Sequence, residues 1–106
     1  AEIEKKLARD PDLFLVAELD GKLVGTGIGG FDGRRGMVYH LAVAHAHRRR
    51  GVAEALMREI EKRLIAKGCI RAFLIAHADN VEARALYEKQ DWVLLANDVV
   101  YSKDIA

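Results

Sequence analysis

The 106-residue sequence contains one cysteine and one proline, and aromatic residues make up only 7% of it. Its single cysteine, Cys69, cannot form an internal disulfide, so a disulfide-stabilised secreted fold is excluded and the cytoplasm is the expected compartment. Long apolar runs are also lacking, because uncharged stretches such as 72–78 are far shorter than the ~20 residues that span a bilayer. No membrane anchoring is therefore expected.

Repeats, linkers and low-complexity stretches are absent as well, and 51% of the residues are apolar. A chain of this length and composition can form one hydrophobic core, so we expect residues 1–106 to be a single domain.

The net charge is only +1, but the charges are unevenly distributed. Residues 33–71 carry 10 basic and 3 acidic side chains, a local charge of +7, whereas 1–32 and 72–106 each carry −3. Such a local excess indicates attraction to an anion, which could be a phosphorylated cofactor, a nucleic acid or an acidic protein surface.

Alternating apolar residues and turn signals predict three antiparallel strands in the first part of the chain. We expect the strands at 13–19, 23–31 and 37–43, joined by turns at 20–21 and 32–36. Before them, charged residues around Ile3 and Leu7 predict the end of an amphipathic helix over 1–9.

The apolar period then becomes helical, with one apolar stripe formed by Val52, Ala53, Leu56, Met57, Ile60 and Leu64. A helix is predicted at 51–67, a buried strand at 69–76, a second helix at 81–90 and a closing strand at 92–101. The segment 37–76 is therefore a strand-helix-strand unit with parallel strands. The predicted class is α/β, with a mixed, mostly antiparallel sheet and helices packed on it.

The most informative stretch is Leu41–Ala53, with the sequence LAVAHAHRRRGVA. A strand end leads through a basic loop into a helix that no Ser, Thr, Asp or Asn immediately precedes, so the first-turn N–H groups lack the usual side-chain cap. These positively polarised groups, with three arginines before them, suit a phosphate or pyrophosphate. The alternative is a solvated basic loop before an ordinary helix.

Two motifs in this order resemble the GNAT superfamily of N-acetyltransferases. The family's acetyl-CoA motif, Gln/Arg-x-x-Gly-x-Gly/Ala, is matched by Arg48-x-x-Gly51-x-Ala53, and the preceding strand end also matches. The family's later Asn-x-x-Ala-x-x-Leu-Tyr segment is matched by Asn80, Ala83, Leu86 and Tyr87. The resemblance covers about residues 12–101 and is greatest to small bacterial members akin to the ribosomal-protein alanine acetyltransferases.

The resemblance implies direct transfer of acetyl from acetyl-CoA to a primary amine. Tyr87 would protonate the departing CoA thiolate, and a backbone N–H near Leu41 or Val43 would face the thioester carbonyl oxygen. Asn80 would line the same cleft, although helix capping also explains it. The residues expected to bind the cofactor are Leu41, Ala42, Val43, Arg48, Arg49, Arg50, Gly51, Val52, Ala53, Asn80 and Tyr87.

The sequence departs from the family pattern at two positions. The family often keeps a Glu in the strand before the loop, whereas this strand has Tyr39 and His40. His40 is therefore the candidate base, since an unperturbed pKa of about 6.5 suits proton removal at neutral pH; the alternative is a packed or solvent-facing histidine. Asp91 replaces the Gly that the family usually has after the second helix. A left-handed backbone is expected at this position, and it costs a residue other than Gly about 1 kcal/mol.

Other functions are less well supported. His45, His47 and His77 have no Cys or carboxylate at ligand spacing, so no metal is expected. The alternative function is a non-catalytic module that binds acyl-CoA or nucleic acid through Arg48–Arg50, but only Tyr39 lies near this loop, and base stacking needs several aromatic rings. No motif identifies the amine acceptor.

The resemblance also implies an opening strand and helical pair, whereas the first predicted element here is the helix end at 1–9. A strand and at least one helix would then be missing, and the strand at 13–19 would have an unpaired edge with little charge. We expect either a homodimer that covers this edge or an upstream segment outside this sequence.

Overall fold

The computed structural model describes residues 11–106, which form two compact units that divide after Ile75. The first unit contains the 3-10 turns η1 (Pro11–Leu13) and η2 (His45–His47), a four-stranded sheet and the helix α2 (Val52–Ala66). The second contains the helix α3 (Val81–Lys89). The helix end predicted at 1–9 lies outside the described residues, and the single domain stays a prediction.

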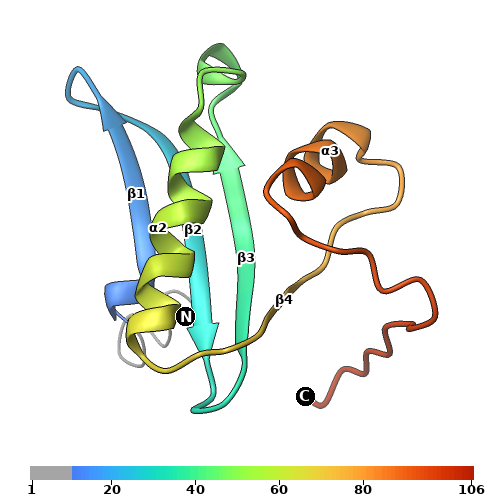
Figure 1. The fold of residues 1–106 in the computed structure, drawn as a ribbon. Helices are drawn as coiled ribbons and strands as arrows, with labels where there is room; N and C mark the ends of the chain where they lie inside the picture. The colour runs from blue at the N-terminus through green and yellow to red at the C-terminus, as the bar shows by residue number, and fades with distance from the viewer. Residues whose placement is uncertain (1–10) are drawn as a thin grey trace. The chain divides into compact units, whose positions relative to one another are not determined.

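The sheet of the first unit has the strand order β1-β2-β3-β4 (Figure 1). β1 (Phe14–Leu19), β2 (Lys22–Phe31) and β3 (Gly36–Val43) form the predicted antiparallel meander. β4 (Ala72–Leu74) follows α2 and pairs with β3 in parallel, so the strand-helix-strand unit and the mixed α/β sheet are confirmed.

β4 is shorter than the strand predicted at 69–76. Its flanking residues Ile70 and Ile75 are 93% and 65% exposed, so the ends of this apolar run are not buried in the sheet. Cys69, the first residue of the predicted strand, is buried next to Gly36.

α2 lies along one face of the sheet (Figure 1), and glycines in β2 allow it to approach closely. A Cβ atom on Gly27 would lie 3.0 Å from Ile60 Cδ1, and one on Gly25 would lie 3.0 Å from Val52 Cγ1. The apolar stripe predicted for this helix is confirmed, because its buried residues are Leu56, Met57, Ile60 and Leu64.

The side chain of Asp32 stabilises the turn between β2 and β3. Asp32 Oδ1 accepts hydrogen bonds from the backbone N–H groups of Arg34 (2.8 Å) and Arg35 (2.7 Å). These bonds stabilise the carboxylate, so the pKa of Asp32 lies below its ordinary value. Gly33, with φ 97°, supplies the left-handed residue of the turn.

β1 is an edge strand in the part of the chain that the structure describes, as predicted. Its side chains Val16 and Leu19 are 50% and 43% exposed, and Glu18 is its one charged residue. The homodimer expected to cover this edge stays a prediction.

α3 begins after Asn80, whose Oδ1 accepts a hydrogen bond from the N–H of Ala83 at 3.2 Å. It ends in a Schellman-like turn, in which Trp92 N donates to Tyr87 O at 3.0 Å. Asp91 has φ 68°, which confirms the left-handed conformation predicted at this position.

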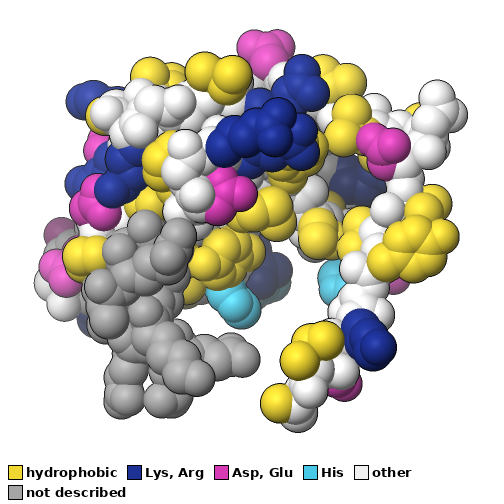
Figure 2. Space-filling model, turned by 90° about the horizontal axis from the view of Figure 1, so that it is seen from below, with side chains coloured by type: hydrophobic (Ala, Val, Ile, Leu, Met, Phe, Trp, Pro, Cys, Tyr) yellow, Lys and Arg dark blue, Asp and Glu magenta, His cyan; other side chains and the backbone are white. Residues whose placement is uncertain are grey.

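The strand predicted at 92–101 is wrong, because residues 92–106 form neither helix nor strand. The apolar run is interrupted at Asn97-Asp98, where Asp98 N donates to Leu95 O at 3.2 Å in a local turn. Hydrophobic side chains remain visible on the surface (Figure 2), and this segment exposes Val93, Leu94, Val99, Val100, Tyr101 and Ile105. No helix within residues 11–106 has the length and hydrophobicity needed to cross a bilayer.

Candidate functional site

A β-bulge interrupts β3 just before the predicted cofactor-binding segment. Thr26 pairs with Ala42 and Ile28 pairs with Tyr39, so Gly27 alone faces two residues, His40 and Leu41. His40 takes up the extra length with φ 54°.

The bulge changes the side of the sheet on which the following side chains lie. Leu41 Cδ1 is 3.3 Å from the position of a Cβ atom on Gly27, so Leu41 lies on the α2 face. Without the extra residue, regular alternation from Val38 would place Leu41 on the opposite face. The bulge thus sets the orientation of the strand end Leu41–Val43.

His40, the candidate base, is exposed at this bulge. Its ring packs edge-on against Tyr39, with 5.4 Å between the ring centroids, and its backbone oxygen accepts a hydrogen bond from Thr26 Oγ1 at 3.5 Å. Solvent therefore reaches a histidine that lies directly before the predicted cofactor-binding strand end, which is compatible with proton exchange.

The loop from β3 to α2 is held by hydrogen bonds to its own backbone and to β2. Ala44 N donates to Val24 O and His47 N donates to Ala44 O, each at 2.8 Å. The side chain of Arg48 also participates, because its Nε donates to Val43 O at 3.2 Å. The loop is therefore an ordered turn of the chain.

The last residues of this loop form a backbone pattern that suits an anion. Arg49 (φ 64°) and Gly51 (φ 81°) have positive φ on either side of Arg50, whose φ is negative. Alternation of this kind is typical of a nest, in which successive N–H groups turn toward one side, and Arg49–Gly51 is called the nest below. No carboxylate or hydroxyl side chain caps α2 at Gly51, so the predicted uncapped helix start is confirmed. The first bond of the α2 ladder is Ala55 N to Gly51 O, and the N–H groups of Val52 and Ala53 precede it at the start of the helix.

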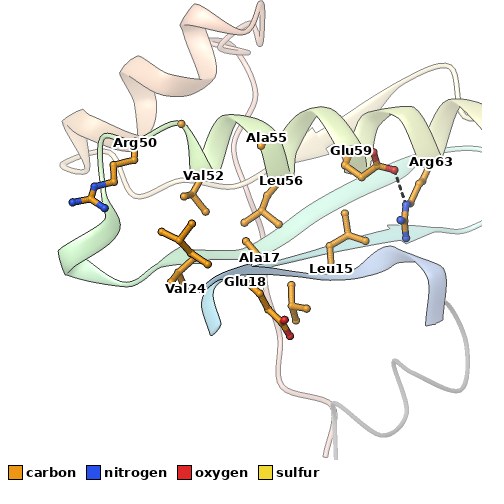
Figure 3. Close-up of a pocket in the computed structure, with 13 residues that line it drawn as sticks. Leu15, Ala17, Glu18, Val24, Arg50, Val52, Ala55, Leu56, Glu59 and Arg63 are labelled. Atoms are coloured by element: carbon orange, nitrogen blue, oxygen red, sulfur yellow. Dashed lines mark hydrogen bonds and ion pairs between the residues drawn. The ribbon is translucent and has the colours of Figure 1, made fainter. Parts of the chain in front are cut away.

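A groove with a volume of about 610 Å³ lies between β1 and α2 (Figure 3). Its floor and walls are mostly apolar, formed by residues such as Leu15 of β1, Val24 of β2, and Val52 and Leu56 of α2. Arg50 and Gly51 border it at the loop. The groove is therefore an apolar surface that adjoins the nest.

An ion pair lies at the other end of this groove, where Arg63 Nε donates to Glu59 Oε2 at 2.9 Å. The hydrogen bond from Arg63 lowers the pKa of the Glu59 carboxyl. The pair therefore stays charged at neutral pH, so the groove has a charged group at each end.

The second unit contains Asn80 and Tyr87. The ordinary pKa of a tyrosine already lies well above neutral pH, and burial raises the pKa of the half-buried Tyr87 phenol further, so the hydroxyl is present in its protonated form. The Asn80 side chain is engaged as the cap of α3, which accounts for its presence without a ligand. In the first unit, a hydrogen bond from Arg48 to Val43 joins the segments Leu41–Val43 and Arg48–Ala53. Asn80 and Tyr87 lie on the second unit, at the start of α3 and in its last turns.

Three features of the site were not predicted. They are the bulge at His40, the bond from Arg48 to Val43, and His47, whose Nδ1 is buried and lacks a hydrogen-bond partner among the described residues. The sequence signal for the bulge is the spacing of the apolar residues Val38 and Leu41, which are three positions apart. Residues on one face of a regular strand are an even number of positions apart. Residues 11–106 contain no cluster of three His, Cys, Asp or Glu that could hold a metal ion.

Comparisons with known proteins agree with these motifs. The model of the acetyltransferase (GNAT) family matches residues 1–92. An acetyltransferase of Pectobacterium atrosepticum is 48% identical over 91 residues, which are 86% of this chain and 64% of that protein. The chain therefore spans less than two thirds of the length of this relative.

Solved structures share the fold. An aminoglycoside 6'-N-acetyltransferase from Acinetobacter haemolyticus has a TM-score of 0.77 and 25% identity, with 99% of this chain and 79% of that chain covered. A ribosomal-protein-alanine N-acetyltransferase from Brucella melitensis has a TM-score of 0.69 and 28% identity, with coverage of 87% and 70%. From the family match and these similarities, we conclude that the chain belongs to the acetyltransferase (GNAT) family.

Proposed function

We propose that the protein transfers an acetyl group from acetyl-CoA to a primary amine. The observation that carries this proposal is the nest before α2, where left-handed Arg49 and Gly51 flank Arg50 and no side chain caps the helix. In a member of the GNAT family, this arrangement supports a binding site for the pyrophosphate of CoA.

The cofactor-binding role is assigned to two neighbouring segments of the first unit. The backbone N–H groups of Val52 and Ala53 would bind the pyrophosphate, and Arg49 and Arg50 would add positive charge. The strand end Leu41–Val43 would bind the arm that carries the thioester. Bound acetyl-CoA supplies the activated acyl group, and the protein supplies orientation and proton transfer.

The reaction requires two proton transfers and an oxyanion site. The amine nitrogen attacks the thioester carbon; the C–N bond forms, the C–S bond breaks, and CoA leaves as a thiolate. We assign removal of the amine proton to His40 and protonation of the thiolate to Tyr87, whose raised pKa keeps its phenol protonated. A backbone N–H near Leu41 or Val43 would donate to the oxyanion.

The acceptor is proposed only as a primary amine. The two structural relatives above are named for acceptors as different as an aminoglycoside and the alanine of a ribosomal protein. Both carry amino groups, which agrees with the proposed chemistry and leaves the class broad.

A direct test incubates the protein with acetyl-CoA and a panel of aminoglycosides, polyamines and peptides with free N-termini, and measures CoA release and product mass. We expect amine-dependent CoA release and an acceptor heavier by one acetyl group. Binding of acetyl-CoA without amine-dependent turnover across the panel would instead support the non-catalytic alternative.

A further inference from the structure

The side chain of Arg48 binds the backbone of its own loop. Its Nε donates to the carbonyl oxygen of Val43, the last residue of β3, at 3.2 Å. Val43 is itself held in the sheet opposite Gly25. The bond therefore ties the far side of the loop to the rigid strand end from which the loop departs.

The position of this bond matters because the following residue is strained. Arg49 directly follows and has φ 64°, a left-handed conformation that non-glycine residues seldom adopt. The nest over Arg49–Gly51 exists only while this conformation is held. Arg48 is extended, with φ −70° and ψ 156°, and its N–H also donates to His45 O at 3.4 Å, so backbone and side chain anchor it together.

The matched motif indicates which property of the Arg48 side chain matters, its N–H donor or its charge. The matching pattern takes Gln or Arg at this position, and these two residues share a side-chain N–H group while only Arg is charged. Gln Nε2 is separated from Cα by the same number of bonds as Arg Nε. A bond to a backbone carbonyl needs such a donor at this distance and does not need the charge.

We propose that Arg48 is a positioning residue, which raises cofactor affinity by holding the loop to Val43 O and not by its charge. The charge attraction for the pyrophosphate then comes from Arg49 and Arg50. This inference rests on the proposed function, because it assumes that the nest binds the pyrophosphate of CoA.

The test compares Arg48→Gln with Arg48→Met, which are both neutral and of similar length but differ in the N–H donor. We expect Gln to bind CoA within about threefold of the unmodified protein, and Met to bind about tenfold more weakly, because only Gln can restore the bond. The KM for acetyl-CoA should follow the same order with kcat unchanged. As a charge control, Arg50→Gln should weaken binding by an amount that shrinks as salt rises.

If Arg48→Gln and Arg48→Met lose CoA affinity equally, and both losses shrink as salt rises, the inference is overturned and Arg48 is a charge contact. Amide hydrogen exchange of residues 49–53 without ligand provides a second readout: exchange should be faster in Met and unchanged in Gln. If the unmodified protein does not bind CoA, the proposed function fails, but the exchange experiment still decides the role of Arg48. Equal exchange in both variants would overturn that role.

Discussion

The two helices are stabilised in opposite ways. α2 buries four side chains against the sheet and has no side-chain cap, whereas α3 has a cap from Asn80 and no buried residue. Because packing holds α2 against the sheet, this helix forms without a side-chain cap at its first turn. α3 depends on local bonds, and Asn80 already caps its N-terminus, so the start of α2 is the helix end that we propose as the anion site.

The largest expected effect comes from removing the packing of α2. Ile60 is fully buried, so Ile60→Ala should lower the free energy of unfolding of the first unit by about 2–5 kcal/mol. The matched control is Ile65→Ala on the same helix, which is 69% exposed and should change it by less than about 0.5 kcal/mol. Urea titration of both variants measures the difference, and equal losses would contradict the packing account.

A second change tests the acid on α3. Tyr87→Phe should lower kcat by roughly 10- to 1,000-fold and leave the KM for acetyl-CoA nearly unchanged, because a proton donor acts in the transition state. Steady-state kinetics decide it. A kcat within a factor of two of the unmodified protein would make Tyr87 a packing residue.

The pH dependence sharpens this second test. Because burial raises the phenol pKa, the acid form should persist through neutral pH, and on the alkaline side kcat should fall as the pH rises through that raised pKa. This alkaline limb should be absent in Tyr87→Phe. If kcat of Tyr87→Phe still falls at the same alkaline pH, that fall belongs to the titration of another group.

Removing the cap of α3 should have a smaller effect. Asn80→Ala should destabilise the helix by about 0.5–2 kcal/mol, since the N–H of Ala83 loses its acceptor. Amide hydrogen exchange over 81–89 provides the measurement, and the adjacent Asp79→Ala variant provides the control. Equal exchange in the two variants would contradict the capping role.

The smallest expected effect is a gain at the end of α3. Asp91→Gly should stabilise this helix by up to about 1 kcal/mol, because glycine adopts the left-handed conformation of φ 68° without steric penalty. Thermal unfolding and exchange over the last turn can detect it. A loss of stability would mean that the Asp91 side chain makes a contact worth more than this strain.

The same contrast explains what could be predicted from the sequence. The stripe of Leu56, Ile60 and Leu64 predicted α2 correctly because helical spacing alone places these residues on one face. The uncapped start at Gly51 was predicted correctly because caps are local features of the sequence.

The remaining features depend on contacts between segments. The bulge at His40 depends on register with β2, and the bond from Arg48 to Val43 depends on how the loop folds back. The strand at 92–101 was wrongly predicted because apolar composition does not show whether a run finds a partner strand, and a local turn at Asp98 forms instead. The roles of His40 and Tyr87 in catalysis stay predictions.

The central claim is that the nest at the start of α2 binds the pyrophosphate of acetyl-CoA. It is tested most directly by calorimetric titration of Gly51→Glu against Gly33→Glu, since both glycines have positive φ and no atom within 4 Å of an added Cβ. The two variants share the new charge and the backbone strain, but only Gly51→Glu places a carboxylate at the nest. We predict that Gly33→Glu binds acetyl-CoA like the unmodified protein and that Gly51→Glu shows no measurable binding; equal affinity in the two variants would contradict the account.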